Sequence, residues 1–180
     1  MTGEPLTPQI LVVENDPYIG QSTCRLLIEL LSPLGIGFEK ITWVIGTYPK
    51  NQTEDFFRVE RVVDIDNPSH VQRLHLYPGQ GFMLALLDGN LGEPDEQPGA
   101  THGWHLARPI KESGASIFYM SGLPQSNTRM AEAAGEDPSQ KGLDWATTTH
   151  KGTPLMFEED LRCFLSALGW LQEAPASLAS

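Results

Sequence analysis

An aspartate at the end of an apolar run is the residue of this sequence best placed to contact a ligand. Residues 82–87 read FMLALL, and Asp88, Gly89 and Asn90 follow them directly. A continuous apolar run that ends in turn residues is typical of a strand buried on both faces of a parallel sheet. In such sheets ligands bind beyond the carboxyl ends of the strands, where Asp88 would lie. Standing alone, an Asp in this position would more often cap the following turn.

Polar residues also follow the other predicted strands. Residues 10–13, 117–120 and 145–149 are each predicted to be strands. With right-handed crossovers, parallel strands deliver their C-terminal residues to one edge of the sheet. We therefore expect six side chains to converge on one rim: Glu14, Asn15, Asp16, Asp88, Ser121 and Lys151. Taken singly, Ser121 would be a turn residue and Lys151 an ordinary surface lysine.

Helical patterns separate these strands. Apolar residues recur with the helical period in residues 18–31, after a proline at position 17 that suits a first helical turn. Further helices are expected at residues 69–76, 103–112, 128–134 and 157–171. Strands that alternate with helices indicate an α/β fold with a doubly wound parallel sheet. Two more β-rich segments, 41–45 and 56–65, could form a hairpin in which one strand is an addition at a sheet edge.

Length, charge and cysteine content limit the class of protein. The 180 residues, 40% of them hydrophobic, suit one domain with a flexible arm at residues 1–8 and a flexible tail at 173–180. The formal charge of −11 repels a phosphate backbone and argues against nucleic acid as a partner. No signal peptide or membrane-length apolar run is present, so we expect a cytoplasmic protein without membrane contact. Cys24 and Cys163 are expected to be buried free thiols.

Four segments, taken in order, resemble the receiver domain of two-component response regulators. They are ILVVENDP at residues 10–17, LLDGN at 86–90, YMSG at 119–122 and HKG at 150–152. Each segment alone is unspecific, but their order, strand context and chemistry match over residues 10–171. The resemblance implies a receiver-like domain at residues 9–172, with a five-stranded parallel sheet in the flavodoxin-like order 2-1-3-4-5.

The same resemblance assigns the second strand. Receivers carry an Asn-Gly at a characteristic distance before the acceptor aspartate, where the second strand meets the second helix. Asn67 lies at that distance before Asp88. Residues 59–65 would then be the second strand, and residues 36–58 an inserted β-rich segment.

The resemblance makes Asp88 the phosphoacceptor, with a phosphohistidine on a histidine kinase or phosphotransfer protein as donor. A carboxylate can attack phosphorus and form an aspartyl phosphate. Lys151 would pair with the phosphoryl group, and Ser121 would hydrogen-bond it, which converts added charge into a change of shape. Mg²⁺ would be held by oxygen atoms of five residues: Glu14, Asn15, Asp16, Asp88 and Asn90.

The implied protein is a phosphoryl acceptor rather than an enzyme with a separate substrate. Its own chemistry would be self-catalysed phosphotransfer and slow autodephosphorylation. No DNA-binding output domain fits beside the receiver, so the protein would signal alone, by contact with an unidentified protein target.

Three departures from the family pattern bear on this function. Asn15 stands where the family has the second of two adjacent acids, so Mg²⁺ is expected to bind weakly. Gly152 replaces a proline after Lys151, and Thr148 stands where an aromatic is usual. These changes favour an alternative, a pseudo-receiver that binds proteins without functional phosphorylation.

Other site types have less support. A haloacid-dehalogenase-like phosphatase needs an acid at position 90, which is Asn, and no phosphate loop of the flavodoxin kind follows the first strand. A metal site around His102 and His105, with Asp95 and Glu96 nearby, is less expected than solvated loop side chains.

Overall fold

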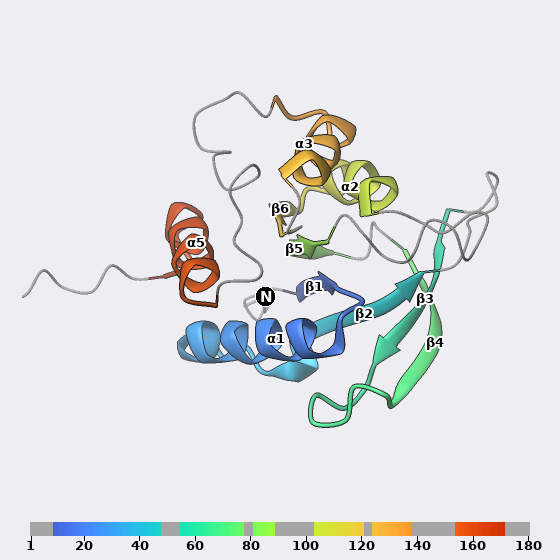
Figure 1. The fold of residues 1–180 in the computed structure, drawn as a ribbon, viewed down its shortest axis with the longest axis vertical. Coiled ribbons are helices and arrows are strands. Elements are labelled where there is room, and N and C mark those ends of the chain that lie inside the picture. Colours follow the sequence, from blue (N-terminus) through green and yellow to red (C-terminus); the bar gives the residue numbers. More distant parts are fainter. Residues whose placement is uncertain are drawn as a thin grey trace, which may run out of the picture.

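The computed structural model of this chain describes residues 9–47, 55–77, 81–88, 103–120, 124–137 and 154–171 (Figure 1). Its strands are β1 Gln9–Val13, β2 Ile41–Thr47, β3 Phe57–Val62, β4 Val71–Leu76, β5 Phe82–Leu87 and β6 Ser116–Tyr119. Its α-helices are α1 Pro17–Leu31, α2 Gly103–Glu112, α3 Pro124–Ala133 and α5 Pro154–Ala167, and two short 3-10 helices are η1 Ser32–Leu34 and η2 Phe38–Lys40.

The six strands form one mixed sheet in the order β4-β3-β2-β1-β5-β6. β1 pairs in parallel with both β2 and β5, and β5 pairs in parallel with β6. β3 runs antiparallel to β2 and to β4. The carboxyl ends of β1, β2, β5 and β6 therefore share one edge of the sheet.

Helices cover both faces of the parallel strands, with α1 and α5 on one face and α2 and α3 on the other (Figure 1). Alternate residues of β1 serve the two faces, as expected for strand geometry. Ile10 and Val12 pack in the core beneath α1 and α5, whereas Leu11 and Val13 pack in the core beneath α2 and α3. All four are fully buried, as is typical of a parallel strand with helices on both sides.

The predicted sheet of five parallel strands in the order 2-1-3-4-5 is wrong. The sheet has six strands, and β3 and β4 are antiparallel additions at one edge. The second parallel strand is β2, which lies inside the segment 36–58 that was assigned as an insertion. Of residues 59–65, assigned as that second strand, residues 59–62 belong to β3, and residues 63–65 lie in the β3–β4 turn. The predicted last strand, residues 145–149, lies outside the described residues.

The predicted helix at residues 69–76 is also wrong, because these residues supply β4. Val71 and Leu74 have helical spacing, but each residue of β4 pairs with β3, from Val62↔Val71 to Phe57↔Leu76. The chain reverses through a tight turn in which the N–H of Asn67 bonds to the carbonyl of Asp64 at 3.1 Å. Asn67 therefore belongs to a hairpin turn and does not start a helix, so its distance from Asp88 carried no information on the second strand.

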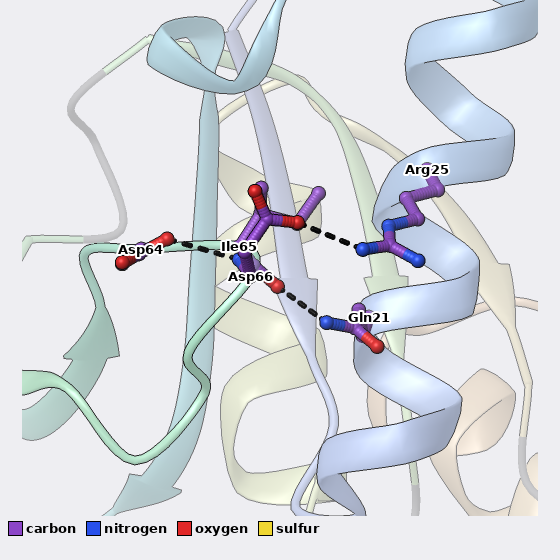
Figure 2. A network of polar contacts seen from close by, with 5 residues as sticks. All are labelled: Gln21, Arg25, Asp64, Ile65 and Asp66. Atoms are coloured by element: carbon purple, nitrogen blue, oxygen red, sulfur yellow. Dashed lines mark hydrogen bonds and ion pairs between the residues drawn. The ribbon is translucent and has the colours of Figure 1, made fainter.

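The β3–β4 turn is attached to α1 by two side chains of the helix (Figure 2). Gln21 Nε2 donates to the carbonyl of Ile65 at 2.6 Å, and Arg25 Nη2 lies 2.8 Å from Oδ1 of Asp66. Asp64 stabilises the turn by accepting from the N–H of Asp66 at 3.0 Å. The added hairpin is thus tied to the helix that follows β1.

Two further expectations can be compared with the structure. Cys24 is buried as predicted, but Cys163 is exposed, because its position on α5 faces away from the sheet. Among the described helices, none combines the length and the apolar character needed to cross a membrane.

Candidate functional site

Glu14 and Asp88 lie next to each other at the shared carboxyl edge of the sheet. Val13 pairs with Leu87 across β1 and β5, and the next residue on each strand is an acid. The N–H of Asp88 donates to the carbonyl of Val13 at 2.9 Å, and the N–H of Glu14 donates to the carbonyl of Val44 at 3.0 Å. The hydrogen-bond ladder thus continues beyond the strands and fixes the backbone of both acids.

Both of these acids are buried, Glu14 at 0% and Asp88 at 2% relative exposure. The alternation along β1 and β5 places them on the face that α1 and α5 cover, the face of Val12 and Leu86. Buried carboxylates are costly unless hydrogen bonds or opposite charges compensate them. Oxygen atoms are the ligands that Mg²⁺ prefers, so the donor chemistry of this pair fits such an ion.

Asp16 has a structural role as the N-cap of α1. Its Oδ1 accepts from the N–H of Tyr18 at 2.9 Å and from the N–H of Ile19 at 3.0 Å. The N–H of Asp16 in turn donates to Oε1 of Glu14 at 2.9 Å. One carboxylate oxygen of Asp16 is therefore committed to the start of the helix, and its predicted role as a metal ligand stays a prediction.

The structure thus brings together four of the predicted site residues: Glu14, Asn15, Asp16 and Asp88. Asn15 is half-buried between the two acids of its loop. Asn90, Ser121 and Lys151 lie outside the described residues, as do Asp95, Glu96 and His102. His105 is exposed on α2. Within the part of the chain that the structure describes, no three His, Cys, Asp or Glu side chains gather as a metal site.

Sequence reasoning missed one residue that contacts this edge, Trp43 of β2. Its Nε1 donates to the carbonyl of Glu14 at 3.0 Å. The indole is fully buried. A parallel pairing of β2 with β1 would have pointed to this contact, but the segment had been assigned as an insertion.

A cavity of about 300 Å³ lies beside this region, between α1 and α5. Its walls come from both helices: Tyr18, Ile19, Ser22, Thr23, Leu26, Phe157 and Glu158. The lining is mainly apolar, and Tyr18 is 80% exposed. The cavity adjoins the helix that Asp16 caps, but the buried acids are not among its lining residues.

The sequence matches no protein-family model, and it has no significant match among the curated proteins.

Proposed function

We propose that this chain is a phosphoacceptor of a two-component or phosphorelay system and that Asp88 receives the phosphoryl group. The observation that carries the proposal is the burial of Asp88 beside the equally buried Glu14 at the carboxyl edge of parallel strands. A nucleophile at this edge is held by the ladder bond from its N–H to Val13. The protein would act in the cytoplasm, alone, through contact with a protein target.

The transfer itself is a displacement at phosphorus. A carboxylate oxygen of Asp88 forms a bond to phosphorus, and the bond from phosphorus to the donor histidine breaks. The electron pair of that bond stays on the histidine nitrogen, and because the other ring nitrogen of the donor carries a proton, the products are a neutral imidazole and an aspartyl phosphate. Mg²⁺, when bound by Glu14 and Asp88 with Asn15 and Asn90, would offset the negative charge on the phosphoryl oxygens. Lys151 and Ser121 are proposed to contact the phosphoryl group.

A second candidate function is a protein-interaction module that is not functionally phosphorylated. The arrangement of the loop after β1 favours it. Asn15 carries no charge, and Oδ1 of Asp16 is occupied by two N–H groups of α1. The rim then offers a cation fewer charged oxygens than the sequence pattern suggested. In this case Asp88 would be a buried structural acid.

Intact-mass spectrometry after incubation with acetyl phosphate and Mg²⁺ distinguishes the two functions. The phosphoacceptor function predicts a gain of one phosphoryl group in the wild type and none in Asp88→Asn. Asp64→Asn is the matched control, because Asp64 is an exposed acid in the β3–β4 turn, at the opposite edge of the sheet from the rim. A wild type that gains no phosphoryl group, or an Asp88→Asn variant that still gains one, would end the proposal.

A further inference from the structure

Trp43 contacts the loop of the candidate site from the neighbouring strand. It lies on β2, one residue before Val44, and its side chain is fully buried on the face that α1 covers. The register Val12↔Trp43 and Val13↔Val44 brings this part of β2 alongside the end of β1. The indole therefore reaches the first residue after β1, which is Glu14.

β2 holds the backbone of Glu14 at both of its polar groups. The N–H of Glu14 donates to the carbonyl of Val44 at 3.0 Å, and its carbonyl accepts from Nε1 of Trp43 at 3.0 Å. The first bond continues the sheet ladder and exists for any side chain at position 43. The second depends on an indole, because a buried carbonyl needs a donor and no apolar side chain supplies one.

The ring of Trp43 is itself held in place by the close approach of α1. A Cβ atom on Gly20 would overlap Cζ2 and Cε2 of the indole and would lie 2.6 Å from Nε1. Glycine at this position lets the helix backbone pack directly on the ring. The indole is therefore enclosed between β2 and α1, with its N–H directed at Glu14.

Hydrogen bonds connect Glu14 to the rest of the loop and to the start of α1. Oε1 of Glu14 accepts from the N–H of Asp16, and Asp16 caps α1 through the N–H groups of Tyr18 and Ile19. Loss of the Trp43 hydrogen bond would thus weaken the hydrogen bonds that order residues 14–19. These residues include Glu14, which lies next to Asp88 at the end of the paired strands β1 and β5, and Asn15, which follows it.

We propose that Trp43 is a positioning residue for phosphorylation of Asp88, acting through its hydrogen bond to the carbonyl of Glu14. The reaction part of this inference rests on the proposed function, whereas the positioning of the loop does not. The indole N–H holds Glu14 and Asn15 where they can share a cation with Asp88. Removing only this N–H should loosen the loop and slow the transfer while the fold remains.

The test compares Trp43→Phe with Trp170→Phe. Trp170 packs on the same core cluster but lies after α5, so it controls for the loss of an indole from that core. Amide hydrogen exchange gives a readout that needs no phosphorylation. In Trp43→Phe we expect exchange at Asp16, Tyr18 and Ile19 to rise about tenfold relative to Met120, whose N–H bonds to Leu87. Trp170→Phe should change this ratio by less than about twofold.

Labelling with acetyl phosphate and Mg²⁺ provides the second readout. Trp43→Phe should lower the maximal labelling rate about tenfold and leave the acetyl phosphate concentration for half-maximal rate nearly unchanged, because the loss lies in alignment and not in binding of the donor. Trp170→Phe should label at close to the wild-type rate.

The outcomes separate the two proposals. If the wild type is not labelled, the proposed function fails, and the loop positioning is decided by hydrogen exchange alone. Wild-type exchange at Asp16 in Trp43→Phe, or wild-type labelling by that variant, would overturn the role of Trp43. If Trp43→Phe does not fold, the benzothienyl analogue of tryptophan at position 43 makes the same test, since it keeps the ring shape and replaces only the N–H.

Discussion

The hydroxyl of Tyr119 donates a hydrogen bond of 2.5 Å to Oε2 of Glu136, and Lys111 forms an ion pair with the other oxygen of that carboxylate. The contact joins β6, α2 and the segment after α3 on the face opposite Glu14 and Asp88. Burial, together with the hydrogen bond and the negative charge of Glu136, raises the pKa of Tyr119 well above its ordinary value. Burial likewise raises the pKa of Cys24. Both groups thus keep their protons in the folded state.

These two pKa shifts predict a loss of stability at alkaline pH. In the unfolded chain, Cys24 ionises near a pKa of about 8.5 and Tyr119 near about 10, so the unfolded state binds fewer protons above those values. Their contribution is fully present below these unfolded-state values. The free energy of unfolding then falls by roughly 1 kcal/mol per pH unit for each group, above about pH 8.5 for Cys24 and above about pH 10 for Tyr119. The contribution of Cys24 is measured by urea unfolding from about pH 8 to about pH 10. The wild type is compared with Cys24→Ala and with the exposed-site control Cys163→Ala. A Cys24→Ala curve parallel to the wild type would contradict the shift.

Gly20→Ala is expected to destabilise the fold. Alanine is favoured over glycine in a helix by about 1 kcal/mol, but the added methyl group would overlap the buried indole of Trp43. Overpacking of this kind costs about 1–3 kcal/mol beyond that gain. Gly46→Ala in β2 is the control, because its Cβ would lie 3.5 Å from the nearest atom, Oε2 of Glu60. Equal urea midpoints for Gly20→Ala and the wild type would show that α1 can move away from the ring.

Asp16→Ala should lower the free energy of unfolding by about 1 kcal/mol, because the first turn of α1 loses its cap. Asp16→Asn keeps a carbonyl oxygen in the same place and removes only the charge. We expect it to retain the stability and the Mg²⁺ affinity of the wild type. A weaker Mg²⁺ affinity in Asp16→Asn, measured by calorimetry, would instead make Asp16 a metal ligand.

Asn15→Asp should strengthen Mg²⁺ binding about ten- to a hundredfold, or by roughly 1–3 kcal/mol. A second acid beside Glu14 adds a full charge, which hydration of the ion and of the carboxylate offsets in part. Asp16 compensates little for the missing acid, since one of its oxygens caps α1. Titration by calorimetry or tryptophan fluorescence measures the difference, with Asn67→Asp in the β3–β4 turn as a control of equal charge. Equal affinity of the wild type and Asn15→Asp would show that the missing acid does not limit binding.

Much of the fold follows from strong local patterns in the sequence. The apolar runs of β1, β5 and β6 and the periodic residues of α1 were predicted nearly to their ends. Two helices begin earlier than predicted, α3 at Pro124 and α5 at Pro154. In both, the proline stands at the first helical position, where its missing N–H costs nothing. The same signal at Pro17 had been used for α1.

The errors arose where long-range pairing outweighs a local pattern. Val71 and Leu74 fit a helix as well as a strand, and only the pairing with β3 decides between them. β2 has a clear strand composition, but the distance from Asn67 to Asp88 matches the family spacing and favours residues 59–65 as the second strand. The contact of Trp43 with Glu14 joins residues 29 positions apart, and no local pattern encodes it. The acids of the rim can be predicted from the positions at which the strands end. The contacts that support these acids can be predicted only when the order of the strands in the sheet is known.

The central claim is tested most directly by locating the phosphoryl group. After incubation with acetyl phosphate and Mg²⁺, borohydride reduces an aspartyl phosphate to homoserine, which peptide mass mapping assigns to one position. We predict homoserine at position 88 and at no other acid, and none in Asp88→Asn. Homoserine at Asp16 or at an exposed aspartate, or its absence from wild-type protein, would contradict the assignment of Asp88 as the phosphoacceptor.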